Sequence, residues 1–305
     1  MKKIPVDPKF EEQVKVLARR ITQEIFFALG LKKEGLASKL LGPLFSLPTR
    51  RFARVATRFE NDVVAYDPRV AATNALPKLA LQPTAVGVGN IPREGPVLIV
   101  SNHPGALDSM ALVSSIPRPD IAALVSDVPF LHAMEGIRKH VIFVDFETIG
   151  SMVALREAIL HLQNKGAILL FAHGIVEPDP GFMPGARRSI QEWSSSIEVM
   201  LRKVPETRLV IATISNSLLP HFIHHPLTLL RRDPARRQLL GEFLQVIRQM
   251  LSPEKLQVRP RITFSKPLKV SDLGYGRYMP EIIERAQKQM DRHLIRERRP
   301  DDITS

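Results

Sequence analysis

The segment that most constrains the fold runs from residue 97 to residue 108 and reads VLIVSNHPGALD. Its first four residues are apolar and follow Pro96, a pattern typical of a short buried strand. From Leu107 onward the apolar residues recur at helical spacing, which predicts a helix that begins within a few residues. We therefore expect His103 to lie where a strand passes into a helix.

His103 and Asp108 are expected to meet across this turn. Pro104 disfavours the helical conformation for the residue before it, so His103 is expected to be extended. A side chain in the first turn of the helix points back toward the N-terminus, which brings Asp108 to the imidazole. The carboxylate would fix one tautomer and leave the other ring nitrogen free to accept a proton. The alternative is that the two residues only cap the helix, with Asn102 shaping the turn.

Strands and helices alternate from Pro96 onward, which predicts an α/β fold with a mixed, largely parallel central sheet flanked by helices and preceded by an N-terminal helical segment. Strands are expected at 97–100, 122–125, 141–144, 167–171, 209–214 and 261–264, and helices at 110–116, 151–164 and 235–251. Ligands gather at the carboxyl ends of such strands, where His103, Asp145 and His173 would emerge.

Four regions are predicted along the chain: a basic amphipathic helical segment at 1–60, a connector at 61–92, a catalytic domain at 93–270, and a C-terminal basic helix and tail at 271–305. In the first region we expect helices broken at Gly30, Gly35, Gly42–Pro43 and Pro48.

The apolar stripe of residues 8–26 is expected to pack on the protein or to lie in a membrane interface. Nearby arginines would face lipid phosphates in the second case: Arg50, Arg51, Arg54 and Arg58.

The composition is that of a globular protein with an anionic partner. The 305 residues are 44% hydrophobic and carry a formal net charge of +12, which favours binding to anionic surfaces. No apolar run reaches the roughly 18 residues of a membrane span, so we expect a cytoplasmic, peripherally membrane-associated protein on an anionic membrane surface. Basic runs interleaved with aromatic residues are absent, so we expect no nucleic-acid partner. Without cysteine, disulfides and thiolate catalysis are excluded.

The Asn-His-x4-Asp pattern from Asn102 to Asp108 resembles the signature of the glycerol-3-phosphate and lysophosphatidic acid acyltransferase family. Further segments resemble later blocks of that family in the same order, at 127–145, 169–174, 183–186 and 261–268. The resemblance covers about residues 93 to 270. It implies transfer of a fatty acyl group from acyl-CoA or acyl-carrier protein to a hydroxyl of a lysophospholipid or glycerol-phosphate-like acceptor. His103 would be the general base and Asp108 its orienting partner, without metal or bound cofactor.

Two blocks depart from the family pattern. Family members are thought to hold the acceptor phosphate with arginines, but Phe146 follows Asp145 and Ile175–Val176 stands where Thr-Arg is expected. His173 replaces the usual Glu. Arg138, Lys139, Arg187 and Arg188 are the candidate replacements, or solvated surface residues. The predicted substrate-binding set is Asn102, Gly105, Arg138, Asp145, His173, Gly174, Gly185, Arg187 and Arg188, with N–H groups near Gly105 stabilising the oxyanion.

Two other clusters have both a metal-binding and a structural interpretation. His173, Glu177 and Asp179 are metal ligands by type, or part of a proline-rich loop. The three histidines at 221, 224 and 225 indicate a metal site, a pH-sensitive loop or a polar surface loop. For the whole chain, the alternatives to acyl transfer are thioester hydrolysis, binding of anionic lipid without catalysis, and nucleic-acid binding.

Overall fold

The central element of the fold is β2 (Val97–Ser101), the strand predicted from the sequence. A computed structural model describes residues 7–28, 36–145, 148–252, 256–274 and 276–297. The described residues contain one seven-stranded sheet with the order β1-β7-β6-β2-β5-β3-β4. The other strands are β1 (Thr84–Val86), β3 (Ile121–Ser126), β4 (Val141–Val144), β5 (Ala167–Phe171), β6 (Arg208–Ser215) and β7 (Arg261–Phe264).

The sheet is mixed and largely parallel, which confirms the predicted fold class. Strands β6, β2, β5, β3 and β4 run in parallel, whereas β7 is antiparallel to β6 and β1 is parallel to β7. Ser101 at the end of β2 pairs with Phe171 on β5 and with Ala212 on β6. The turns after β2 and β5 therefore start at the same level and lie side by side.

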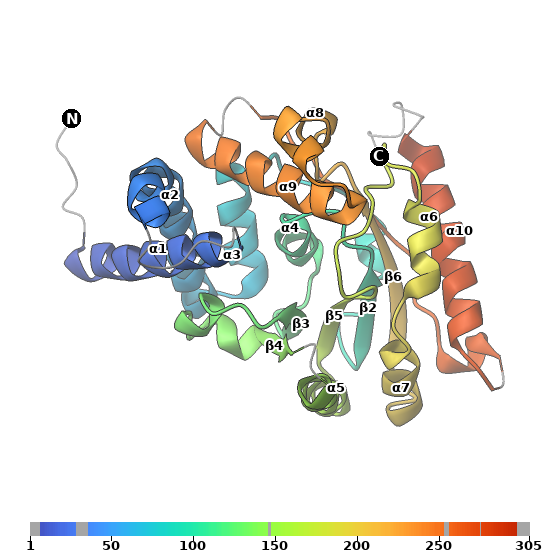
Figure 1. The fold of residues 1–305 in the computed structure, drawn as a ribbon. Coiled ribbons are helices and arrows are strands. Elements are labelled where there is room, and N and C mark those ends of the chain that lie inside the picture. Colours follow the sequence, from blue (N-terminus) through green and yellow to red (C-terminus); the bar gives the residue numbers. More distant parts are fainter. Residues whose placement is uncertain (1–6, 29–35, 146–147, 253–255, 275, 298–305) are drawn as a thin grey trace.

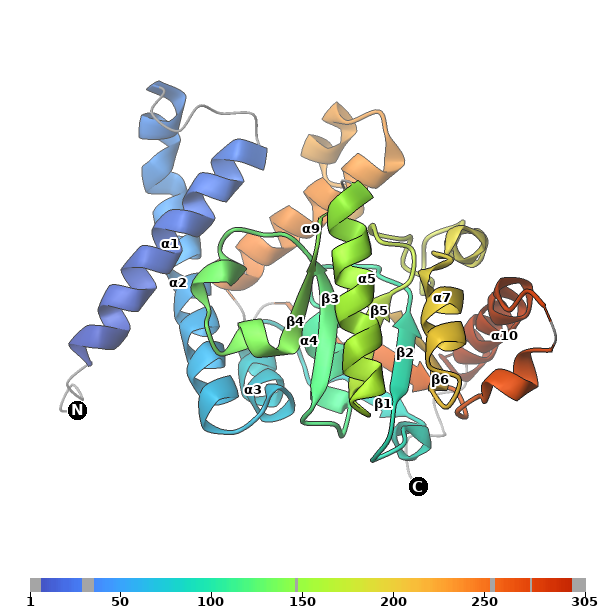
Figure 2. The same cartoon turned by 90° about the horizontal axis from the view of Figure 1, so that it is seen from below.

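Helices cover both faces of the sheet (Figures 1 and 2). The helices after β1 are α4 (Asp108–Ser115), α5 (Thr148–Gln163), α6 (Ala186–Ser189), α7 (Ser196–Lys203), α8 (Pro220–Ile223), α9 (Pro234–Leu251) and α10 (Met279–Glu297). Short 3-10 turns include η1 (Leu76–Lys78), η2 (Val88–Asn90), η3 (Leu131–Ala133), η4 (Ile137–His140), η5 (Ile190–Glu192), η6 (Pro226–Leu230) and η8 (Val270–Leu273).

The sheet has a hydrophobic cluster on each face, and side chains of β2 alternate between the two clusters. Leu98 and Val100 pack in the cluster formed with α5, α7 and α10, while Val97 and Ile99 pack in the cluster that contains α4. Successive strand residues point to opposite faces of a sheet, so a strand with helices on both sides is apolar throughout. This explains the uninterrupted apolar run that marks β2 in the sequence.

The N-terminal helices pack on the protein. Val14, Leu17 and Ile21 of α1 (Pro8–Ala28) are buried in a cluster with residues of α2 (Leu36–Ala65), α3 (Pro68–Ala75) and the β3–β4 connection. The predicted breaks at Gly42–Pro43 and Pro48 are wrong, because α2 continues through both prolines. Packing of α2 against its neighbours offsets the lost backbone hydrogen bonds. The breaks predicted at Gly30 and Gly35 lie outside the described residues.

Residues 61–92 hold more regular structure than a connector. They include the end of α2, the helix α3 and the strand β1. Asp67 caps α3 by accepting a hydrogen bond from the backbone N–H of Val70, and Pro68 occupies the first helical position, which favours a helix start.

At the other end of the chain, α10 packs on the sheet through buried Ile282 and Met290. None of the described helices is long and apolar enough to cross a bilayer.

Candidate active site

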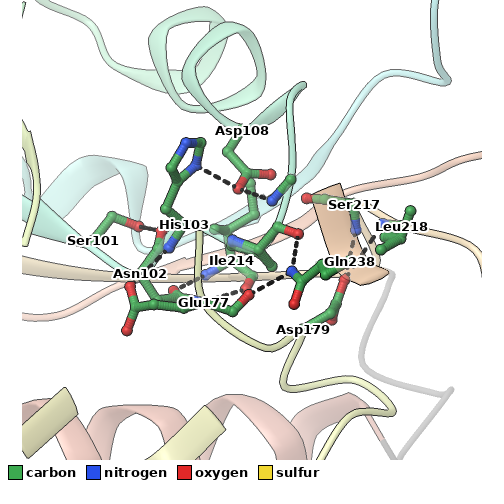
Figure 3. A network of polar contacts seen from close by, with 12 residues as sticks. Ser101, Asn102, His103, Asp108, Glu177, Asp179, Ile214, Ser217, Leu218 and Gln238 are labelled. Atoms are coloured by element: carbon green, nitrogen blue, oxygen red, sulfur yellow. Dashed lines mark hydrogen bonds and ion pairs between the residues drawn. The ribbon is translucent and has the colours of Figure 1, made fainter. Parts of the chain in front are cut away.

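The structure brings His103 and Asp108 together at the carboxyl end of β2 (Figure 3). His103 Nδ1 lies 3.1 Å from Asp108 Oδ2, and the same oxygen accepts the backbone N–H of Gly105 at 2.6 Å. Asp108 is fully buried, whereas a quarter of the His103 side chain is exposed. With Nδ1 directed at the carboxylate, Nε2 is the ring nitrogen that remains for a proton from a ligand.

The backbone and the ring of His103 are both held in place. Its N–H donates to Glu177 Oε2 at 3.0 Å, and its carbonyl accepts the N–H of Glu177 at 2.8 Å. The ring stacks on Phe171 with centroids 4.1 Å apart. These contacts join the β2 turn to the loop after β5, so the imidazole is fixed by residues distant in sequence.

Glu177 is the important site residue whose role the sequence did not reveal. Its other carboxylate oxygen accepts hydrogen bonds from Ser189 Oγ at 2.8 Å and Trp193 Nε1 at 3.1 Å. Burial raises the pKa of Glu177, and these hydrogen bonds together with nearby His173 act in the opposite direction. Glu177 thus holds the turn that carries His103, as a buried hydrogen-bond acceptor.

Gln238 on α9 adds a second connection behind the turn. Its Nε2 donates to the carbonyl of Pro104 at 2.9 Å and to that of Glu177 at 2.7 Å. Glu242, one helical turn further along α9, is buried there too, and burial together with the charge of Asp108 raises its pKa. α9 therefore covers the turn that carries His103 with polar groups.

Asp179 connects the β5 loop to the end of β6. Oδ1 accepts the N–H groups of Gly181 and Asn216 at 2.9 and 3.0 Å, and Oδ2 accepts that of Ser217 at 3.0 Å. Burial raises the pKa of Asp179 to about 7. Because both of its oxygens accept backbone N–H groups, Asp179 is a structural residue. Among the described residues, no group of His, Asp and Glu side chains is arranged to hold a metal ion.

A cavity of about 490 Å³ opens beside His103, a size within the range of small-molecule sites. His103, His173 and Gly174 line it. The walls come from the ends of β3, β4 and β5, from the start of α4 and from α5, and they include Ser109, Ser126, Ser151, Ser194 and Ser196. Neither Lys nor Arg is among the described residues that line this cavity.

A second, apolar cavity of about 280 Å³ adjoins the first between α2, α4 and β3. The two share the lining residues Ala106, Ser109, Val125 and Leu131. Aromatic and aliphatic side chains form most of its wall, among them Phe52, Val55, Phe59, Met110, Phe130 and Met134. Such a wall binds hydrocarbon favourably.

Two of the predicted substrate-binding residues, Asn102 and Gly105, use polar groups in hydrogen bonds within the protein. The side chain of Asn102 is buried and bridges β2 to β6, since Nδ2 donates to the carbonyl of Ile214 and Oδ1 accepts its N–H, both at 2.9 Å. N–H groups near Gly105 were predicted to stabilise an oxyanion, and that of Gly105 itself donates to Asp108. These polar groups of Asn102 and Gly105 therefore build the turn between His103 and Asp108, and their contact with a substrate stays a prediction.

The predicted cationic residues are not brought to the cavity. Arg138 is exposed on η4, and Arg187 is exposed on α6, where it forms an ion pair with Asp291 of α10. Arg188 is also exposed on α6. None of the three lines the cavity beside His103.

The other predicted ligand-binding residues differ in their surroundings. His173 and Gly174 lie in the cavity wall. Asp145 follows Val144, a lining residue at the end of β4, and is exposed without itself lining the cavity. Gly185 has a φ of +94° and precedes α6, so it provides a turn rather than a cavity wall.

The four arginines of the N-terminal segment each contact a protein group. Arg50 and Arg54 form ion pairs with Glu11 of α1. Arg51 donates to the carbonyls of Met250 and Leu251 at the end of α9, and Arg58 lies over the ring of Phe10. Arg50, Arg51 and Arg58 are also exposed, so their contact with lipid phosphates stays a prediction.

Solved structures include chains that are similar to this one. The chain is similar to the crystal structure of the 1-acyl-sn-glycerophosphate (LPA) acyltransferase PlsC from Thermotoga maritima, with a TM-score of 0.46 and 14% sequence identity over 92% of this chain and 93% of that one. No protein-family profile matches the sequence, and no curated protein matches it.

Proposed function

We propose that this protein is an O-acyltransferase that moves a fatty acyl group from acyl-CoA or acyl-carrier protein to the hydroxyl of a lipid acceptor. The observation that carries the proposal is the placement of His103. Its ring is held by buried Asp108 on one side and lines a cavity that adjoins an apolar one. A base in a cavity that carries serine and histidine side chains and adjoins a more apolar cavity suits a substrate with a reactive head and a hydrocarbon tail.

In the proposed mechanism, Nε2 of His103 removes the proton from the acceptor hydroxyl while Asp108 stabilises the imidazolium. The acceptor oxygen attacks the thioester carbonyl and forms a tetrahedral intermediate. The carbon–sulfur bond then breaks, the ester is released, and the proton on His103 passes to the thiolate. No protein nucleophile, metal or bound cofactor takes part, because the acceptor itself attacks.

The acyl chain is proposed to occupy the apolar cavity, with its thioester near Ala106 and Ser109, which line both cavities. The acceptor is proposed to be a lysophospholipid or a glycerol-phosphate-like alcohol at an anionic membrane surface. Since neither Lys nor Arg lines the described wall of the cavity beside His103, a phosphate inside it would have neither an ammonium nor a guanidinium partner there. Phosphate-free alcohols such as monoacylglycerol therefore belong in the same substrate panel.

The test is a product-identifying screen that combines both thioester donors with lysophospholipids, glycerol 3-phosphate and monoacylglycerol. We expect an acylated acceptor and acceptor-dependent release of thiol with wild type, and neither with His103→Ala. Release that is unchanged by every acceptor would indicate a thioesterase. Binding of lipid without turnover of any donor would indicate a non-catalytic lipid-binding protein.

A further inference from the structure

The segment between β6 and α9 exposes an unusual amount of apolar side chain. On η6, Leu227, Leu229 and Leu230 are 48%, 62% and 77% exposed, and Leu239 on α9 is 51% exposed. We call these four leucines the leucine tip. Single exposed leucines are ordinary, but four within 13 residues form a patch that indicates an interaction surface.

The leucine tip is held outward by its own turn. Thr228 is fully buried, and its hydroxyl reaches the carbonyl oxygens of Ile223 and His225, each at 2.7 Å. The backbone N–H of Thr228 also donates to the carbonyl of His225. With Thr228 fixed inward, its neighbours Leu227 and Leu229 are directed to solvent. The hydrogen bonds of the turn therefore keep the leucine side chains exposed.

Positive charge surrounds the leucine tip. Residues 220–240 contain Arg231, Arg232, Arg236 and Arg237, and their only acidic residue is Asp233. The Asp233 side chain caps α9 by accepting the N–H of Arg236. Apolar side chains bordered by guanidinium groups match the boundary between acyl chains and anionic headgroups.

We propose that the leucine tip and its four arginines dock this protein on an anionic lipid bilayer. The leucines would enter the headgroup boundary and the arginines would contact lipid phosphates. Arg231, Arg232 and Arg236 are exposed, and Arg237 donates to the carbonyl of Arg231. The N-terminal arginines contact Glu11, α9 carbonyls and Phe10. Charge complementarity selects a lipid surface over a neutral apolar partner.

Docking through this face places the bilayer near the catalytic turn. Gln238, next to Leu239 in the chain, donates to the carbonyl of Pro104 in that turn. Helix α8 and the start of α9 lie toward the end of the sheet where β2 finishes (Figure 2). A lipid acceptor would then reach His103 from the membrane; this last step alone rests on the proposed acyl transfer.

The experiment is co-sedimentation of the full chain with vesicles of equal parts phosphatidylglycerol and phosphatidylcholine, and with vesicles of phosphatidylcholine alone. We expect binding to the anionic vesicles and at least about tenfold weaker binding after Leu227→Ser, Leu229→Ser and Leu230→Ser are combined. Arg231→Ser with Arg232→Ser should weaken binding to the anionic vesicles and reduce its salt dependence.

The matched control is Val64→Ser with Tyr66→Ser at the end of α2. These side chains are 70% and 68% exposed. The end of α2 lies away from the start of α9 in Figure 2, so vesicle binding should stay within about twofold of wild type. Binding by the triple leucine variant equal to wild type would overturn the proposal. So would a wild-type dimer that the triple variant converts to monomer, because the tip would then bind a second copy. His103→Ala should bind vesicles like wild type, so loss of activity and loss of docking are separable.

Discussion

Two histidines follow neighbouring strands and line the same cavity, yet their surroundings differ. His103 after β2 contacts a fully buried carboxylate, and Glu177 holds its backbone. His173 after β5 lies 3.4 Å from Glu192, whose side chain is 71% exposed. A buried, hydrogen-bonded carboxylate holds an imidazole in one orientation, whereas an exposed ion pair is weak and screened by solvent. The comparison indicates that a position at the end of a strand is not enough for a histidine to be a good candidate base. A hydrogen bond to a buried carboxylate is what distinguishes His103 from His173.

The largest predicted effect is that of His103→Ala. Removing the imidazole removes the proton acceptor, so kcat for acyl transfer should fall by at least about 10³-fold. KM for the thioester should change little, because the apolar cavity is untouched. Steady-state kinetics on protein with an unchanged circular dichroism spectrum measure both. Retention of wild-type kcat would refute the assignment of His103.

Asp108→Asn should reduce kcat by about 10²-fold, since the amide stabilises neither the tautomer nor the imidazolium. The backbone N–H of Gly105 still has the Asn side-chain oxygen as an acceptor, so the turn should persist. Glu192→Asn is the matched control beside the other histidine and should leave kcat within about twofold of wild type. Equal losses in the two variants would contradict the distinction between the histidines.

The buried acids behind His103 predict an unusual dependence of stability on pH. Burial raises the pKa of Glu177, Asp179 and Glu242, that of Asp179 to about 7. Between the unfolded values and these raised values the folded protein binds more protons, so the unfolding free energy should fall as pH rises from about 4 to about 7. For Asp179 alone the change is at most on the order of 4 kcal/mol.

Denaturant unfolding at several pH values measures this slope. Glu242→Gln removes a carboxyl whose pKa is raised by burial and puts a neutral isostere in its place, so the slope should become shallower. Glu284→Gln removes an exposed carboxylate and should leave it nearly unchanged. Stability that rises steadily from pH 4 to 7 would show that these acids are not buried as described.

The smallest predicted effect is that of His173→Ala, which should change kcat less than about threefold. A moderate rise in KM is expected, because the side chain lines the cavity. The same kinetic assay serves, and a loss of kcat comparable to that of His103→Ala would place the chemistry at both histidines.

Local pattern in the sequence predicted most of the fold. The apolar runs of the strands are short and bounded, so β2, β4, β5 and β7 begin where expected. The long helix α2 was not predicted, because tertiary packing outweighed two prolines. The strand β1 was missed because three residues with only partial burial leave little periodic signal.

In the candidate site, too, local contacts could be predicted from the sequence and contacts between distant residues could not. His103 and Asp108 are five residues apart, so Pro104 and helix geometry were enough to predict that they meet. Glu177 contacts His103 across 74 residues, and Gln238 contacts Pro104 across 134. No local pattern predicts such pairs. The alternation of Glu177 and Asp179 with Pro178 and Pro180 after a buried strand did indicate a proline-rich loop.

The most direct test of the account is the ratio of acyl-transfer rate constants of His173→Ala and His103→Ala, measured in one assay with the same donor and acceptor. The account predicts a ratio above about 300, because His103 is hydrogen-bonded to a buried carboxylate, whereas the ion pair of His173 is with an exposed one. A ratio near one, or below it, would contradict the claim that the pair at the end of β2 is the catalytic base.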